Sequence, residues 1–149
     1  MLAPRVVTWA QRMEAESLRN GAPLPASLQQ LARDVGVRDV ARVRIVVVDR
    51  VPLPDEAPLR AAASQVGLSQ ESASGMTLGY AIYARRGEEA DVRLLSHELR
   101  HVAQYEAAGG IPAFLARHLE DLARVGYEDS PFEADARAHE RRSLPGPGA

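Results

Sequence analysis

Two histidines and a glutamate in the second half of the chain have the types and spacing for metal chemistry. His97 and His101 are four residues apart, and Glu98 directly follows the first of them. On an α-helix, residues four apart lie about 40° apart around the axis, so the two imidazoles project side by side and can bind one metal ion. The Glu98 carboxylate lies on the flank of that face, where it can reach a water molecule without being a ligand. The spacing therefore predicts a divalent metal site with a general base beside it.

The surrounding residues predict an amphipathic helix that carries this pattern. Asp91 precedes the helix, where a negative charge suits the helix dipole, and Gly109 follows it, where glycine suits the end of a helix. The face opposite to the histidines is apolar and can form core; it consists of Val92, Leu95, Leu99, Val102 and Ala103. The plainer interpretation, in which the two histidines only support a polar network, stays open at this point.

A third protein ligand is needed, because a catalytic zinc ion takes three protein ligands and leaves one position for water. The chain contains no cysteine, so this ligand must be His, Asp or Glu. We favour Glu133, because Ser130 and Pro131 predict the start of a helix whose first turn contains Glu133. Ser130 and Glu133 also match a capping box, in which the Glu133 side chain would only bond the backbone at the helix start.

The two remaining histidines are weaker candidates for the third ligand. His139 lies six residues after Glu133 and points to a different side of the expected helix. His118 falls within a segment that reads as a core helix, where we expect it to be a partly exposed polar residue. His139 therefore stays the alternative to Glu133.

The pattern as a whole resembles a known group of enzymes. A His-Glu-x-x-His sequence followed about thirty residues later by a helix-borne glutamate is similar to the gluzincin clan of zinc metallopeptidases. More narrowly, residues 79–83, 94–104 and 126–136 resemble small bacterial zincin-like domains, some of which accompany extracellular contractile injection systems.

This resemblance implies roles for individual residues. His97, His101 and Glu133 would bind Zn²⁺, and Glu98 would be the general base. Large gluzincins carry an acid four residues beyond the ligand glutamate, which orients a zinc-bound histidine, but Arg137 stands at that position here. The support of the metal ligands is therefore in doubt.

We expect a zinc-dependent metallopeptidase that hydrolyses peptide bonds in a peptide or protein substrate. Glu98 would take the proton of the attacking water and pass it to the leaving amine. The oxyanion needs a further donor, for which we favour Tyr127, with His139 and Tyr105 as alternatives. A rival hypothesis is a non-catalytic zincin-fold module that serves binding or assembly. A third is an effector toxin with the same chemistry and a different target.

Composition sets the limits of these hypotheses. The chain has 149 residues, 46% of them apolar, which suits one zincin-like domain over residues 1–143 with a disordered tail over 144–149. A net charge of −2 gives no reason to expect nucleic acid. We find no membrane span and no signal peptide, so we expect a cytoplasmic protein, although export without a signal would look the same. The oligomeric state is not indicated.

Periodicity predicts a small α+β domain, in which a short mixed sheet of two to four strands is packed by several helices and the His-Glu-x-x-His helix is central. Besides the two motif-bearing helices, we expect helices at 4–20, 26–35, 58–66 and 111–125 and strands at 43–49 and 77–85, with a loop at 68–75. The second strand could form a sheet edge that binds an extended peptide. The N-terminal helix could cover the cleft as a pro-segment would.

Overall fold

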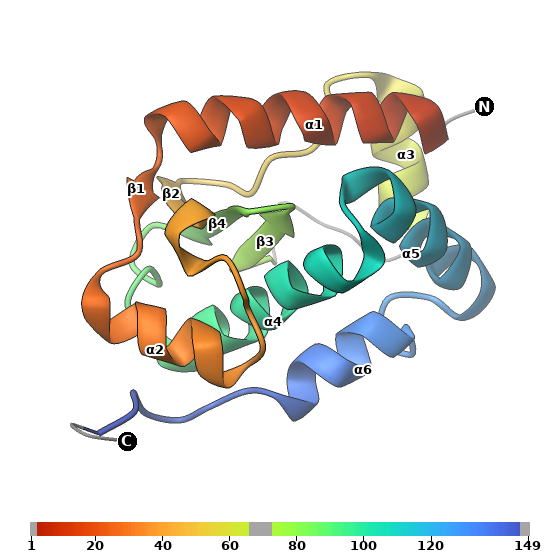
Figure 1. Ribbon diagram of the computed structural model, residues 1–149. Helices are drawn as coiled ribbons and strands as arrows, with labels where there is room; N and C mark the ends of the chain where they lie inside the picture. Colours follow the sequence, from red (N-terminus) through yellow and green to blue (C-terminus); the bar gives the residue numbers. More distant parts are fainter. Residues whose placement is uncertain (1–2, 66–72, 147–149) are drawn as a thin grey trace.

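The computed structural model describes residues 3–65 and 73–146 and has an α+β fold (Figure 1). Six α-helices pack around a four-stranded mixed sheet, which confirms the fold class expected from the sequence. The helices are α1 (Ala3–Asn20), α2 (Ala26–Asp34), α3 (Ala57–Gln65), α4 (Val92–Ala108), α5 (Ile111–Val125) and α6 (Pro131–Ala138). The strands are β1 (Ala22–Pro23), β2 (Arg44–Val48), β3 (Gly75–Leu78) and β4 (Ala81–Arg85), and a 3₁₀ turn, η1, spans Val40–Arg42.

The sheet has the strand order β1-β2-β4-β3. β2 and β4 run parallel, with Val46 opposite Tyr83, whereas β1 pairs with β2 and β3 pairs with β4 in the antiparallel sense. β2 is β-branched in four of its five residues and has the strand position that the sequence predicts. β3 lies at one edge of the sheet, next to the strand that leads into α4.

The single strand expected over residues 77–85 is wrong, because the chain turns back on itself within it. Gly79 has φ +64°, a backbone conformation that L side chains rarely adopt, and it forms the turn between β3 and β4 together with Tyr80. The Glu14 carboxylate on α1 accepts a hydrogen bond from the Tyr80 backbone N–H at 2.8 Å. The strand directly before α4 is therefore the inner strand β4, and the sheet edge is β3.

The helices form layers on both faces of the sheet, with α1 on one face and α4 on the other (Figure 1). Successive residues of β4 point to opposite sides: Ile82 packs with α2 and α4, whereas Tyr83 packs with α1 and α5. Because α1 lies on the sheet face opposite to α4, it does not cover the His97 and His101 face. The expectation of a covering N-terminal helix is therefore wrong.

The helices predicted at 4–20, 26–35, 58–66 and 111–125 occur where the sequence predicts them, with ends that differ by at most one residue. Most of the expected loop over residues 68–75 lies outside the described residues, and its last residue, Gly75, begins β3. Of the tail, residues 144–146 have no regular secondary structure and 147–149 lie outside the described part. Among the helices described, none is long and apolar enough to cross a membrane.

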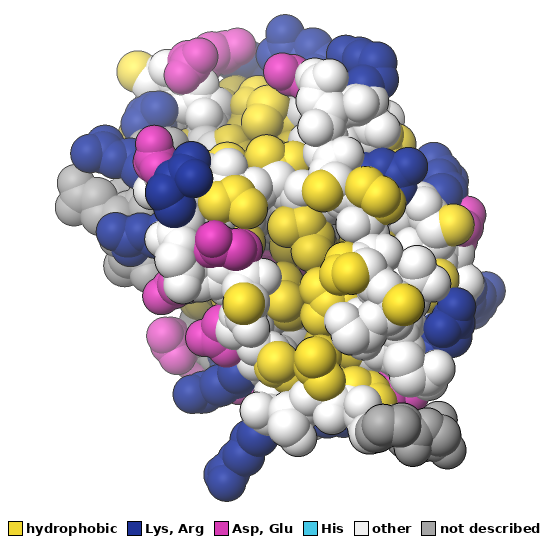
Figure 2. Space-filling view, turned by 90° about the vertical axis from the view of Figure 1, so that its left-hand side faces the viewer, with side chains coloured by type: hydrophobic (Ala, Val, Ile, Leu, Met, Phe, Trp, Pro, Cys, Tyr) yellow, Lys and Arg dark blue, Asp and Glu magenta, His cyan; other side chains and the backbone are white. Residues whose placement is uncertain are grey.

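Figure 2 shows the side of the molecule on which β1 and β2 lie. Apolar side chains form a stripe along this face, flanked by acidic and basic side chains, and no histidine is visible on it. A hollow of about 190 Å³ opens between α1 and β2, lined by Met13, Val46 and Val48 among others. The histidines of the predicted metal site therefore do not reach the surface seen in this view.

The hairpin turn at Gly79 gives a first test of the fold. A methyl group added there would overlap the Glu14 carboxylate, which is held by the Tyr80 backbone N–H, in addition to the strain of a positive φ. Gly87 has φ +95° but nothing within 4 Å of an added methyl group, so it is a matched control. We expect Gly87→Ala to lower the free energy of unfolding by about 1 kcal/mol and Gly79→Ala by about 2–4 kcal/mol. Urea unfolding followed by circular dichroism measures both, and equal losses would contradict the contact between Glu14 and the turn.

Candidate metal centre

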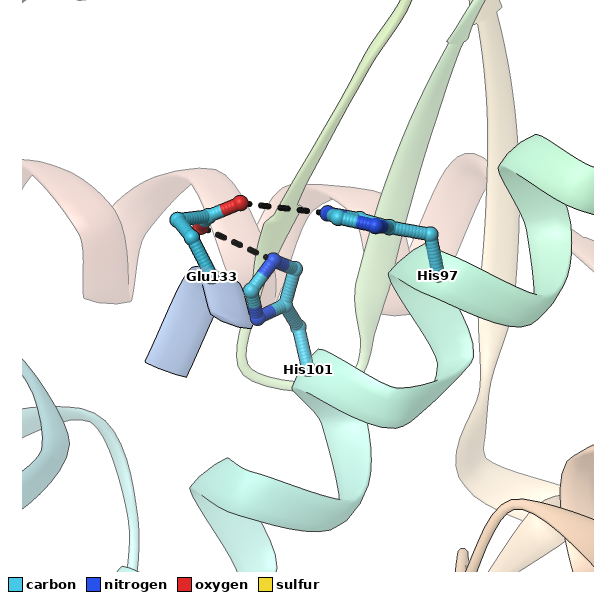
Figure 3. Close-up of side chains that lie close together, drawn as sticks. All are labelled: His97, His101 and Glu133. Atoms are coloured by element: carbon cyan, nitrogen blue, oxygen red, sulfur yellow. Dashed lines mark hydrogen bonds and ion pairs between the residues drawn. The ribbon is translucent and has the colours of Figure 1, made fainter. Parts of the chain in front are cut away.

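Three predicted ligands lie together at the interface of α4 and α6. His97 Nε2 is 3.1 Å from one Glu133 carboxylate oxygen, and His101 Nε2 is 3.0 Å from the other. One potential ligand atom from each residue lies within 4.8 Å of the other two. Figure 3 shows both rings projecting from α4 toward the Glu133 carboxylate at the start of α6. This is the donor set that zinc takes in two-histidine, one-carboxylate sites.

The packing of α4 fixes the direction of the two histidines. The Asp91 side chain caps the helix by accepting a hydrogen bond from the Leu94 backbone N–H, and Gly109 ends the helix in the left-handed conformation. On the opposite face, Leu95, Leu99 and Val102 are each about 1% exposed or less and pack with α2 and the sheet. Since this face is held in the core, the helix cannot rotate without losing that burial, and the histidines must face α6.

Glu133 is positioned by the first turn of α6. Ser130 is the N-cap, and its hydroxyl accepts a hydrogen bond from the Glu133 backbone N–H at 3.4 Å, with Pro131 following at the first helical position. The Ser130 backbone N–H donates to the Tyr127 carbonyl, while the Glu133 carboxylate contacts the two histidines. Ser130 therefore caps the helix, and the Glu133 side chain takes part in the cluster.

The cluster is buried and strongly coupled. Burial raises the pKa of Glu133, but hydrogen bonds and positive charge from His101 and His97 outweigh it and bring this pKa below its usual value. Burial disfavours the charged form of His101, but the contacts with Glu133 and the charge of Glu98 raise its pKa to about 9. In this arrangement both imidazoles favour protonation, so a metal ion would have to displace these protons.

An acid after α6 orients His97. The Glu140 carboxylate lies 2.9 Å from His97 Nδ1, and its other oxygen accepts from Arg93 Nε at 2.7 Å. Arg137, at the position where large gluzincins have an acid, donates to the Glu128 carbonyl at 2.7 Å instead. Glu140 thus supplies the acceptor that the sequence pattern lacks, because the chain turns back toward α4 after α6.

An amide orients His101. The Gln104 side-chain oxygen lies 2.7 Å from His101 Nδ1, while the Gln104 amide nitrogen donates to Asp135 at 2.8 Å and to the Phe132 carbonyl at 3.0 Å. Asp135 also accepts from Arg100 Nε at 2.8 Å. With an acceptor at Nδ1 of both histidines, each Nε2 is the atom left for a metal ion.

Glu98 lies beside the cluster, and its side chain contacts a residue of β3. Its carboxylate accepts a hydrogen bond from the Thr77 hydroxyl of β3 at 2.8 Å, and the residue is only 5% exposed. Burial raises the pKa of Glu98, and the positive charges of His101 and His97 oppose this. A buried carboxylate with a raised pKa next to a metal site is suited to accept a proton.

The three candidates for an oxyanion donor have different surroundings. Burial raises the pKa of Tyr127, and so do the charges of Glu133 and Glu98 and a hydrogen bond to Glu133, which places its hydroxyl at the cluster. His139 directs Nδ1 to the Asp135 backbone oxygen at 2.8 Å. Tyr105 is committed as well, since its buried hydroxyl donates to the Thr77 carbonyl at 3.1 Å. Tyr127 is thus the candidate whose hydroxyl adjoins Glu133.

The sequence reasoning missed one histidine at the site. His118 on α5 lies with Nε2 4.0 Å from Glu133 Oε2 and Nδ1 3.4 Å from the Ser130 hydroxyl. Its ring packs between Phe114 and Phe132, with centroid distances of 5.3 and 5.6 Å. Burial lowers the pKa of His118 to about 4, so the ring is neutral at pH 7. No local spacing connects residues 118 and 133, because the contact depends on how α5 packs against α6.

The sequence patterns also did not indicate the roles of Thr77, Gln104 and Glu140 at this site. Of these, Gln104 had a usable signal, because a residue three positions after a histidine lies within hydrogen-bonding reach on the same helix face. Glu140 and Thr77 reach the motif only through the fold.

The fold and the site define an α+β domain whose central helix carries a candidate metal centre that a second helix completes. The family model of the eCIS core domain matches residues 23–109, and the chain belongs to this family, which is linked to extracellular contractile injection systems. The matched stretch extends from the end of β1 to the end of α4, so it contains His97, Glu98 and His101 and ends before Glu133. No curated protein and no solved structure matches the chain.

Glu140 provides a test of the support of His97. We expect Glu140→Ala to weaken zinc binding about 10–100-fold, because His97 loses the acceptor that fixes its ring. Glu120→Ala removes the same charge from an exposed position of α5 and should leave zinc affinity unchanged. Competition with a chromophoric chelator measures both affinities. Equal zinc affinity in the two variants would show that Glu140 has no part in the site.

Proposed function

We propose that this protein is a zinc metallopeptidase of the gluzincin type, in which His97, His101 and Glu133 bind the metal ion and Glu98 is the general base. The observation that carries this proposal is the convergence of the three ligand atoms within 4.8 Å beside the buried Glu98 carboxylate. The donor set fits zinc, since each histidine has an acceptor at Nδ1 and directs Nε2 to Glu133.

The residues divide the chemistry between them. Zinc, when bound, supplies a Lewis acid and lowers the pKa of water toward neutrality. Glu98 accepts the proton of the attacking water and returns it to the leaving amine, a role that its raised pKa favours. Tyr127 donates a hydrogen bond to the oxygen of the substrate carbonyl, since its hydroxyl lies next to Glu133 and its pKa keeps it protonated.

The substrate we infer is an extended peptide that pairs with β3. This strand is the edge of the sheet and passes directly beside the base: a methyl group added to Gly75 would lie 3.3 Å from Glu98 Cγ. An edge strand offers backbone donors and acceptors to an extended chain. Pairing there would bring the substrate backbone past Glu98.

A second candidate function is a non-catalytic module that serves binding or assembly in a contractile injection system. The match to the eCIS core domain over residues 23–109 favours it, because that family is linked to such systems. A partner protein of the same system would then take the place of a substrate. An effector with the same zinc chemistry is compatible with the first candidate.

Metal analysis of the purified protein tests the ligand set. We expect about one equivalent of zinc in the wild type and in His139→Ala, and its loss in Glu133→Ala, because Glu133 faces both motif histidines whereas His139 faces Asp135. Inductively coupled plasma mass spectrometry after gel filtration measures the zinc content. Equal zinc in Glu133→Ala and wild type would contradict the proposed ligands.

A Glu98 variant separates catalysis from metal binding. Glu98→Gln keeps an acceptor for the Thr77 hydroxyl but cannot take a proton, so we expect full zinc content and a loss of peptide hydrolysis of at least about 100-fold. A library of quenched fluorescent peptides measures the rate. The zinc-loaded wild type and Glu98→Gln could prove equally inactive toward every peptide and toward candidate proteins. This result would contradict the peptidase and favour the assembly module.

A further inference from the structure

The hydrogen bonds of Glu133 must change when a metal ion binds. In this structure His97 and His101 direct Nε2 to the two carboxylate oxygens at 3.1 and 3.0 Å, so each oxygen has a histidine partner. A metal ion takes the lone pair of each Nε2, and the histidines then keep their protons at Nδ1, where Glu140 and Gln104 accept them. Both Nε2–H donors to Glu133 are lost together.

One carboxylate oxygen then loses its histidine donor, and the Tyr127 hydroxyl, which bonds Glu133 here, is the group that the proposed mechanism assigns to the substrate oxygen. If one oxygen of Glu133 binds the metal ion, the other lies at a position where the residue is only 4% exposed. A buried oxygen without a hydrogen bond costs about 1–3 kcal/mol, more for a charged group. The binding of the metal ion therefore depends on a donor that takes over this oxygen.

We propose that His118 is this donor: its Nε2–H bonds the Glu133 oxygen that does not bind the metal ion, and it thereby positions the carboxylate and sets the metal affinity. His118 Nε2 is 4.0 Å from Glu133 Oε2, so a shift of about 1 Å forms the bond. This inference rests on the proposed zinc site. It makes His118 a positioning residue, since it acts through Glu133.

The surroundings of His118 select the tautomer that this role needs. The Ser130 hydroxyl accepts from the Glu133 backbone N–H, which leaves its own hydrogen free to bond His118 Nδ1 at 3.4 Å. With an acceptor role at Nδ1, the proton of the neutral ring is on Nε2, facing Glu133. Phe114 and Phe132 pack against the ring and hold it in this plane.

Two substitutions of His118 separate the hydrogen bond from packing. His118→Gln keeps an N–H donor at a similar reach, whereas His118→Leu fills similar space without one. We expect zinc affinity to fall about 10–100-fold in His118→Leu and to stay within about threefold of wild type in His118→Gln. His139→Leu makes the same chemical change at a residue whose ring faces Asp135 and not Glu133, so we expect zinc affinity to stay within about threefold of wild type there. The measurement is chelator competition with zinc alone, for which no substrate is needed.

A second readout distinguishes this role from a structural one. The contacts of His97 and His101 satisfy Glu133 without His118, so we expect His118→Leu to leave the thermal stability of the zinc-free protein close to wild type and to reduce only the gain in stability on adding zinc. Long-range ¹H–¹⁵N spectra of the zinc-loaded wild type should show the His118 proton on Nε2.

The outcomes separate this inference from the proposed function. If the wild type binds no zinc, the proposed function fails. If the wild type binds zinc but His118→Leu binds it equally well, or His118→Gln is as weak as His118→Leu, only the role of His118 is wrong. Coordination of a third imidazole in X-ray absorption spectra, or a loss of affinity in Tyr127→Phe but not in His118→Leu, would also overturn the role.

Discussion

The contact between Glu133 and the two histidines of α4 is the constraint on which the rest of this structure depends. It places ionisable groups where all three residues are largely removed from water, which is unfavourable unless every polar atom has a partner. The protein meets this condition with two chains of hydrogen bonds that lead outward to arginines. One leads from His97 through Glu140 to Arg93. The other leads from His101 through Gln104 and Asp135 to Arg100.

Both chains of hydrogen bonds join α4 to the C-terminal part of the domain. Arg93 and Arg100 are on α4, while Glu140 and Asp135 belong to α6 or directly follow it. The sheet contributes from the other side, since the Thr77 hydroxyl of β3 holds Glu98 and the Thr77 carbonyl accepts from Tyr105. His97, Glu98 and His101 are all on α4, but Glu98 is held from β3, whereas His97 and His101 face Glu133 of α6.

Sequence patterns predict the parts of this site that depend on local spacing. The His97, Glu98 and His101 arrangement follows from one helical turn, and Glu133 from the cap and proline that begin α6. By contrast, His118 is 15 residues from Glu133, and no periodicity reports how α5 packs on α6. The hairpin at Gly79 was missed for a related reason: alternating residue types continue through the turn, and a single glycine inside a strand pattern is weak as a signal until its φ is known.

The family match covers one part of the candidate metal site and not the other, and this bears on the function of the domain. The segment matched to the eCIS core domain ends at residue 109, so it contains two of the proposed ligands and the proposed base, and the segment after it contains Glu133, Glu140, His118 and Tyr127. A structural metal site would gain from this C-terminal half, because more ligands and tighter hydrogen bonds stabilise the fold. It would gain nothing from Glu98, whose burial raises its pKa and makes its charged form unfavourable. A buried carboxylate held by Thr77 beside the proposed ligands, yet outside the ligand group, has the perturbed pKa that is common among catalytic acids and bases, and on this ground we favour the proposed peptidase over the assembly module.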